Sequence, residues 1–267
     1  MDLNYPFLDG KWIDLAGWEV LVLEETGSTN DDCLKLADEI EGEFVIWAGH
    51  QTAGRGREDR VWYDQPGSAL TFSALMRLKE EELEQIGKFT ALGALSLIDL
   101  LERAFELKAV LKWPNDVLLN NKKVCGILTE ILWKGSKPAA IVLGMGINLT
   151  DAAFEAADEL RAPATSLEAE GEATVDEQAL LEGLLYTIQQ RRQLLGSQAF
   201  LDDWNAKLAY VGQYVEIKKY QGETGRFSPE FVNPDGSLTV RDEAGEQLRL
   251  YSSELSSPDS SAASSGS

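Results

Sequence analysis

Residues 109–149 hold a succession of apolar runs separated by short polar turns, and this succession constrains the fold more than any other part of the chain. Apolar runs with so little chain between them are typical of neighbouring strands. Val117–Leu119 and Val124–Trp133 are expected to pair across the polar turn Asn120–Lys122. Ala109–Lys112 precedes this pair, and Ala139–Leu149 follows it after the turn 134–138.

The remaining periodicity adds strands and helices on both sides of this region. Apolar runs predict three more strands, at Val20–Leu23, Phe44–Ala48 and Ala69–Met76. Apolar residues three and four positions apart predict four helices, over Cys33–Ile40, Leu83–Phe105, about 176–195 and about 198–209. These elements predict an α+β fold in which helices flank a central mixed β-sheet.

The pattern changes after Tyr210, where short alternating runs are separated by turns that contain glycine. These runs predict a small β-barrel whose strands are Tyr214–Lys219, Thr224–Val232, Ser237–Arg241 and Gln247–Tyr251. The serine-rich end of the chain has few apolar residues and predicts disorder. We therefore expect a large domain, a small β domain and a disordered tail, over 1–208, 209–252 and 253–267.

Charge and composition exclude several classes of protein. The net charge of −21 would repel phosphate backbones, so we expect no nucleic-acid partner. No apolar run reaches the length of a membrane span and no signal peptide is evident, so we expect a cytoplasmic protein with no membrane partner. Two distant cysteines and a single histidine exclude a disulfide framework and a Cys/His zinc site. The acidic stretch 151–182 reads as a solvated surface segment.

Gln51–Arg60, which we call the Gly-Arg loop, is the segment richest in possible chemistry. Its two glycines let the backbone approach a ligand, and its three arginines donate to phosphate or carboxylate. The same composition fits a solvated turn whose arginines pair with nearby acids. Residue types alone leave both interpretations open.

Three other segments also have a functional and a plain structural interpretation. Lys112–Asp116 suits a nucleotide and its metal ion, or a charged turn with Trp113 in the core. Lys122 and Lys123 precede a strand that contains Gly126, and glycine inside a strand often marks close approach to a ligand, although the lysines alone fit a solvated hairpin. Ser28–Asn30 fits a helix cap.

Together and in this order, five segments make the chain resemble the bacterial biotin protein ligases. They are GSTN (Gly27–Asn30), QTAGRGR (Gln51–Arg57), KWPND (Lys112–Asp116), KVCGIL (Lys123–Leu128) and GMGIN (Gly144–Asn148). The resemblance covers about residues 22–150 and implies a class II synthetase-like catalytic domain followed by an SH3-like barrel. Only 26 residues precede Gly27, too few for the DNA-binding domain of the larger members, so a monofunctional ligase is expected.

The resemblance also implies a role for each motif residue. Biotin would be bound by Ser28, Thr29, Asn30, Gln51, Gly54, Arg55, Gly56, Arg57, Lys123, Gly126, Gly144 and Gly146. ATP would be bound by Arg60, Trp62, Lys112, Asn115 and Asn148. The catalytic residues would be Arg57, Lys112, Asp116 and Lys123, with Asp116 holding Mg²⁺ or orienting the incoming amine. His50 matches no required position and reads as structural.

The implied reaction joins biotin to ATP and then transfers biotin to a carrier lysine. Biotin, ATP and Mg²⁺ would form biotinyl-5′-AMP, and a biotin carboxyl carrier protein would accept biotin. Cations would offset the repulsion between the biotin carboxylate and the α-phosphate. A lipoate ligase or octanoyltransferase of the same superfamily and a non-catalytic biotin sensor are the alternatives. Members of the family often dimerise through the central sheet, which leaves a homodimer open here.

Overall fold

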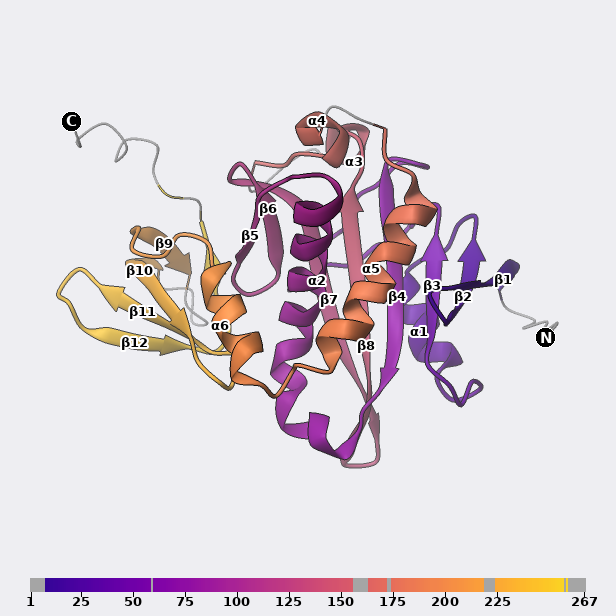
Figure 1. Ribbon diagram of the computed structural model, residues 1–267, viewed down its shortest axis with the longest axis horizontal. Helices are drawn as coiled ribbons and strands as arrows, with labels where there is room; N and C mark the ends of the chain where they lie inside the picture. Colours follow the sequence, from indigo (N-terminus) through magenta and orange to yellow (C-terminus); the bar gives the residue numbers. More distant parts are fainter. Residues whose placement is uncertain are drawn as a thin grey trace.

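A computed structural model describes residues 8–58, 60–155, 163–171, 174–218, 224–256 and 258. Among them, eight strands form one sheet in the order β1-β2-β3-β4-β8-β7-β6-β5 (Figure 1). The strands are β1 (Gly10–Leu15), β2 (Trp18–Leu23), β3 (Phe44–Ala48), β4 (Ala69–Arg77), β5 (Ala109–Lys112), β6 (Asp116–Leu119), β7 (Lys122–Lys134) and β8 (Lys137–Asn148). Only the β2–β3 pair is parallel, so the sheet is mixed, as predicted.

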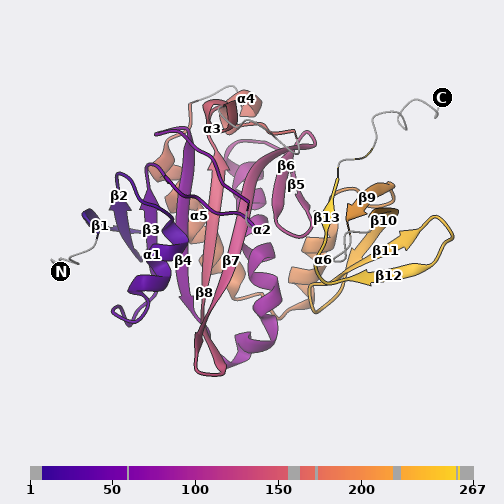
Figure 2. The ribbon, with the colours of Figure 1, turned by 180° about the vertical axis from the view of Figure 1, so that it is seen from behind.

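Helices cover both faces of this sheet. The helical segments are α1 (Thr29–Leu36), η1 (Glu80–Lys88, a 3₁₀ helix), α2 (Phe89–Ala104), α3 (Ala152–Glu155), α4 (Leu167–Gly171), α5 (Glu177–Arg192) and α6 (Gln198–Ala206). Helices α2 and α5 lie on one face (Figure 1), and α1 lies on the other (Figure 2). The prediction of an α+β fold is confirmed.

The alternation of side chains along β4 decides which residues face α1. Phe72 and Ala74 belong to the core cluster that includes the apolar side chains of α2 and α5, whereas Leu75 packs with Cys33 and Leu36 of α1. Successive strand residues point to opposite faces, so Ser73 lies on the face of α1. A hydroxyl is thereby placed in an otherwise apolar strand, next to the first turn of α1.

Two expectations at the start and middle of the chain are corrected by the structure. Strand β1 was not predicted, because it has few apolar residues: Trp12 and Ile13 are half-buried at the sheet edge and only Leu15 is buried. It joins β2 through a turn at Ala16 and Gly17, both with positive φ. The single helix predicted over Leu83–Phe105 is wrong at its start, since Glu80–Lys88 is 3₁₀ helix and the α-helix begins at Phe89. Ion pairs between Glu82 and Arg192 tie η1 to α5.

The C-terminal strands form a separate antiparallel sheet in the order β12-β11-β10-β9-β13. They are β9 (Val215–Lys218), β10 (Thr224–Val232), β11 (Leu238–Asp242), β12 (Gln247–Leu250) and β13 (Glu254–Leu255). The disorder predicted from 253 is wrong for its first residues, because β13 pairs with β9 and Leu255 is buried. The later part of the predicted tail, 259–267, lies outside the described residues.

The acidic stretch 151–182 is only partly a solvated surface. Its central residues 156–162 lie outside the described part of the chain. Thr165, Ser166 and Leu167 are buried, and Leu180 and Leu181 of α5 belong to the core. No helix in the described ranges is long and apolar enough to cross a membrane.

Candidate functional site

A pocket opens on the face of the sheet that carries α1. It holds about 660 Å³ of empty space, including the part open to solvent. Its lining comes from the start of α1, the loop after β3, the turn before β6, and strands β4, β7 and β8. The lining residues are Ser28, Thr29, Asn30, Gln51, Arg55, Gly56, Arg57, Arg60, Val61, Trp62, Phe72, Asn115, Lys123, Gly126, Ile127, Leu128, Gly144, Met145 and Gly146.

The predicted biotin residues therefore converge, with the exception of Gly54. Gly54 lies just behind the lining, where its carbonyl oxygen accepts a hydrogen bond from the Trp62 backbone nitrogen at 2.9 Å. Of the residues predicted to bind ATP, Arg60, Trp62 and Asn115 line the pocket, whereas Lys112 and Asn148 do not. Asp116 also lies outside the lining.

Glycines on the two central strands let other side chains lie directly on the sheet. Gly126 of β7 is paired with Gly146 of β8. A Cβ atom on Gly146 would come within 2.4 Å of the Trp62 ring, and one on Gly144 would come within 2.1 Å of Asn30 Oδ1. Both distances are far shorter than a normal contact, so the glycines are required by close packing.

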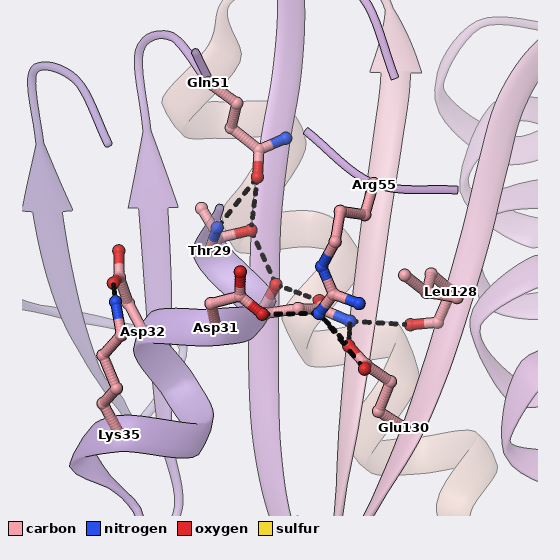
Figure 3. Close-up of polar contacts among 10 residues, drawn as sticks. Thr29, Asp31, Asp32, Lys35, Gln51, Arg55, Leu128 and Glu130 are labelled. Carbon is pink, nitrogen blue, oxygen red and sulfur yellow. Dashed lines mark hydrogen bonds and ion pairs between the residues drawn. The ribbon is translucent and has the colours of Figure 1, made fainter. Parts of the chain in front are cut away.

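A chain of hydrogen bonds links the loop after β3 to α1 and β4 (Figure 3). Gln51 Oε1 accepts from the Thr29 backbone nitrogen at 2.8 Å. The hydroxyls of Thr29 and Ser73 are 2.7 Å apart, and Ser73 Oγ donates to Asn30 Oδ1 at 2.6 Å. Ser73 was missed by the sequence analysis, although a hydroxyl within the apolar run of β4 was a usable signal. Ser28 occupies the N-cap position of α1, as the cap interpretation expected, but its side chain makes no capping hydrogen bond.

The chain continues to a charged group around Arg55. Asn30 Nδ2 donates to Glu130 Oε2 at 2.6 Å. Arg55 Nη2 lies 2.9 Å from the same carboxylate oxygen and 2.5 Å from Asp31 Oδ1. Burial lowers the pKa of Arg55, but Glu130 and Asp31 raise it to a net value above the ordinary one. Glu130 was also missed, because no local sequence feature distinguishes this glutamate of β7 from an ordinary surface carboxylate.

Comparison with known proteins identifies the family. A model of the Biotin/lipoate A/B protein ligase family matches residues 17–148. A biotin–[acetyl-CoA-carboxylase] ligase of Paracoccus denitrificans is 32% identical over 234 residues, which cover 85% of this chain and 96% of that protein. The chain belongs to the biotin protein ligases of this family. The bifunctional ligase/repressor BirA of Bacillus subtilis is 32% identical over 251 residues, or 92% of this chain and 76% of BirA.

A solved structure supports the same assignment for the fold. The biotin protein ligase of Aquifex aeolicus, in complex with biotin and ATP, has a TM-score of 0.74 and 27% identity to this chain. The match covers 89% of this chain and 97% of that one. The shared region therefore includes residues beyond the catalytic sheet of this biotin protein ligase.

Arg57 of this biotin protein ligase connects the Gly-Arg loop to two other parts of the chain. Its Nη1 donates to Asn115 Oδ1 at 3.2 Å, and its Nη2 donates to Ser252 Oγ at 2.9 Å. Asn115 in turn donates from Nδ2 to the Ile127 carbonyl oxygen at 3.1 Å. The two predicted loop arginines thus diverge, since Arg55 reaches α1 and β7 while Arg57 reaches the turn before β6 and the C-terminal segment.

Asp116 lies between two of the predicted catalytic lysines. Its Oδ1 is 2.7 Å from Lys123 Nζ, and its Oδ2 is 3.7 Å from Lys112 Nζ. Lys112 is buried and Lys123 is about three-tenths exposed. Trp113 beside them is buried, as the structural interpretation of this turn expected, while Asn115 of the same turn lines the pocket. Lys122 is exposed, which fits the solvated hairpin, but Lys123 is not.

These contacts bear on the predicted magnesium ligand. The Asp116 carboxylate already contacts the ammonium groups of Lys112 and Lys123. Among the described residues, no group of three or more His, Cys, Asp or Glu side chains that could hold a metal is found. Mg²⁺ that is bound to ATP needs only one or two protein carboxylates, so the role of Asp116 stays a prediction.

Asn148 and His50 are both bonded to other parts of the protein near the site. The Asn148 amide is buried and donates to the carbonyl oxygens of Thr165 and Lys123 at 3.0 and 3.4 Å. His50 Nδ1 lies 2.9 Å from Asp64 Oδ1, so the two ends of the segment 50–64 are held together. Burial raises the pKa of Asp64, while bonds from Gln51 and His50 lower it, with a raised net value.

Proposed function

We propose that this chain is an ATP-dependent biotin protein ligase. It activates biotin to biotinyl-5′-AMP and transfers biotin to the ε-amine of one lysine of the biotin carboxyl carrier protein of acetyl-CoA carboxylase or a related carboxylase. The observation that carries the proposal is the lining of one pocket by uncharged hydrogen-bonding groups, three strand glycines and the ammonium of Lys123. Biotin combines an uncharged cyclic urea, an apolar fused ring that contains sulfur, and a carboxylate, so each part has a matching group.

The ureido end is assigned to Ser28, Thr29 and Gln51. Hydroxyl and amide groups can both donate and accept, as a cyclic urea requires. Gln51 and Thr29 are already bonded to each other, which fixes their orientation before a ligand enters. The Trp62 ring lies directly on Gly146 and next to Gly126, so we expect it to move aside when the biotin rings bind against the backbone of these two glycines.

In the first reaction, a biotin carboxylate oxygen attacks the α-phosphorus of ATP. A new P–O bond forms, the bond to the β-phosphate bridging oxygen breaks, and pyrophosphate leaves. Two anions must approach, so the barrier falls where fixed cations lie beside the developing charge. Lys123 and Lys112 both lie near the carboxylate of Asp116, and Arg57 donates to Asn115. We assign these three cations to the carboxylate and phosphates, with Arg60, Trp62 and Asn115 on the nucleotide side.

In the second reaction, the lysine amine of the carrier attacks the acyl carbon of the mixed anhydride. A C–N bond forms, the bond between the acyl carbon and the phosphate oxygen breaks, and AMP leaves with the electron pair. The amine must lose a proton, and the Asp116 carboxylate already accepts an ammonium hydrogen from Lys123. We assign Asp116 to orienting the incoming amine, and Mg²⁺ to the phosphates of ATP as part of the substrate.

The site also explains the need to exclude water. A mixed anhydride hydrolyses when water reaches its acyl carbon, so a ligase gains by covering it. The Gly-Arg loop is held over the pocket by Arg55 on one side and Arg57 on the other. We place the protein in the cytoplasm, since Cys33 and Cys125 are both unpaired and buried, as suits a reducing compartment.

The test is the formation of AMP and pyrophosphate from ATP with biotin and Mg²⁺, with lipoate as the parallel substrate. A carrier domain is added or withheld. Biotin-dependent signal with label on the carrier lysine supports the proposal. Signal with lipoate alone assigns the chain to lipoate transfer, and biotin binding without turnover makes it a sensor.

A further inference from the structure

The side chain of Arg55 is placed between two carboxylates that no motif contains. Asp31 lies in the first turn of α1, and Glu130 lies in β7, two residues beyond Leu128, which pairs with Gly144. Arg55 Nη2 contacts Asp31 at 2.5 Å and Glu130 at 2.9 Å (Figure 3). We call Arg55, Asp31, Glu130 and Asn30 the Arg55 cluster. It joins the Gly-Arg loop to two elements that belong to the body of the fold.

Glu130 has two tasks within the Arg55 cluster. One carboxylate oxygen receives both the Arg55 guanidinium and the Asn30 amide, at 2.9 and 2.6 Å. Its side chain is about one-quarter exposed, whereas that of Asp31 is 44% exposed. A charge-assisted hydrogen bond is stronger where water competes less, so Glu130 should hold Arg55 more firmly than Asp31 does.

Asn30 is already engaged by protein on both sides of its amide. Its Oδ1 accepts from Ser73, and its Nδ2 donates to Glu130 and to the Leu128 carbonyl oxygen. Because both ends of its amide are bonded to protein, the Asn30 side chain is fixed in place before any ligand arrives, and it has little capacity left to hydrogen-bond a ligand. Asn30 therefore shapes the wall of the pocket, and its orientation depends on Glu130.

We propose that Glu130 is a positioning residue of the biotin pocket, acting through Arg55 and Asn30. Its carboxylate holds the Gly-Arg loop closed over the pocket and fixes the wall formed by Asn30, with Asp31 as a weaker second contact. For its effect on biotin the proposal rests on the function proposed above. Its effect on the loop concerns the protein alone and can be measured without any ligand.

The test compares Glu130→Gln and Asp31→Asn with Asp38→Asn. Each variant removes one negative charge, and glutamine keeps an oxygen that can accept from Asn30. Asp38 is the matched control because its side chain is 77% exposed and its nearest cation, Lys134, lies at 3.7 Å. Asp31→Asn and Asp38→Asn should unfold at temperatures close to that of the wild type. Glu130→Gln keeps an acceptor for Asn30, so its Tm should fall by only about 2–4 °C and the variant stays folded at assay temperature.

The ligand-free readout is the rate of tryptic cleavage within the Gly-Arg loop, which contains three arginines. Loss of a charge-assisted hydrogen bond should speed cleavage about tenfold in Glu130→Gln and about threefold in Asp31→Asn. Asp38→Asn should be cleaved at the wild-type rate. Equal rates in Glu130→Gln and Asp38→Asn would overturn the proposal, whether or not the chain binds biotin.

The second readout is biotin-dependent pyrophosphate release. Glu130→Gln should raise the KM for biotin about tenfold. The KM for ATP should stay near the wild-type value, because the Arg55 side chain contacts Asp31 and Glu130, which are not assigned to the nucleotide. A fall in kcat with an unchanged KM for biotin would overturn the positioning role. Absence of turnover in the wild type would refute the proposed function, while the cleavage rates would still decide the role of Glu130.

Discussion

Replacing Gly144 by alanine should destabilise the protein, and the structure gives the size of the effect. The new Cβ atom would lie 2.1 Å from Asn30 Oδ1 and 2.9 Å from Asn30 Cγ. Gly144 does not have a positive φ, so alanine can adopt its backbone conformation and the cost is steric alone. Strand β8 is paired on both sides, with β4 and β7, and cannot shift easily. The Asn30 side chain must therefore move.

Moving Asn30 breaks its hydrogen bonds to Ser73 and Glu130, both 2.6 Å long. A neutral buried hydrogen bond contributes about 1 kcal/mol and one to a charged group about 2 kcal/mol. Against this loss of about 3 kcal/mol, the smaller entropy of the unfolded alanine chain offsets about 0.5–1 kcal/mol. The net loss in the free energy of unfolding is about 2 kcal/mol, or a fall in Tm of about 4–8 °C for a domain of this size.

Urea and thermal unfolding of Gly144→Ala measure this loss, and Gly146→Ala is the matched control. Its Cβ would meet the Trp62 ring at 2.4 Å, which is just as severe a clash. Trp62 follows the Gly-Arg loop and is only half-buried, so it can move away at little cost to the folded core. Gly146→Ala should lose less than about 1 kcal/mol but bind biotin more weakly. Equal stability of the two variants would refute the view that Asn30 is fixed and Trp62 is not.

Three further predictions concern charged side chains. Arg57→Ala should weaken biotin binding about tenfold and release biotinyl-AMP into solution, because the loop loses a charge-assisted hydrogen bond, and Tm should change little. Chromatography of free and bound biotinyl-AMP measures this release. A variant that retains biotinyl-AMP as well as the wild type does would contradict the prediction. Lys123→Gln should lower the rate of pyrophosphate release about 10²-fold, since it removes the cation assigned to the biotin carboxylate. A rate of pyrophosphate release equal to that of the wild type would exclude this role. Burial raises the pKa of Glu82, but hydrogen bonds and charge from Arg192 and Lys79 lower it by more, so the net pKa lies below the ordinary value of 4.5. A lowered carboxyl pKa stabilises the fold above pH 4.5 and the benefit disappears as pH falls through the folded pKa. Glu82→Gln should thus reduce stability at pH 7 and flatten the acid side of the urea-midpoint profile; parallel profiles would contradict this.

The sequence predicts most of the catalytic sheet because its strands have strong local signals. Apolar runs bounded by turns mark β3, β4, β7 and β8 to within a few residues. The motifs lie at strand ends, in strand glycines and in the loop after β3, so they converge once the sheet forms. Local signals fail where tertiary contacts decide the structure, as in η1, whose Glu82 is bound by Arg192.

Ser73 and Glu130 could not be assigned from the sequence because their roles depend on strand order. Strand β4 pairs with β8, although β5, β6 and β7 intervene along the chain. Only this pairing places Ser73 opposite Gly144 and, on the other side of β8, Gly144 opposite Leu128. No periodicity within β4 or β7 contains that information.

At the start of the C-terminal tail, the average composition predicts disorder although the first residues are ordered. Serines dominate the residues after 251, which predicts disorder. One apolar side chain, Leu255, is nevertheless buried in the small sheet, and the Ser256 backbone donates to the Glu216 carbonyl oxygen at 2.9 Å. These contacts also bring Ser252 to Arg57 of the Gly-Arg loop.

The contacts of Asn30 and Arg55 separate two ways in which a motif residue can serve a binding site. All four side chains line the pocket, but Asn30 is bonded to protein through both ends of its amide and Arg55 contacts two carboxylates, whereas Gln51 is bonded to Thr29 through Oε1 and Lys123 contacts Asp116. A side chain already bonded to protein loses no water when a ligand binds and keeps its position, so it lowers the cost of ordering the site. Asp31 and Glu130 largely balance the charge of Arg55, whereas Lys112 and Lys123 both face the carboxylate of Asp116 and Arg57 donates to Asn115 and Ser252. The two arginines of one short motif thus have different chemistry because of the groups that they contact.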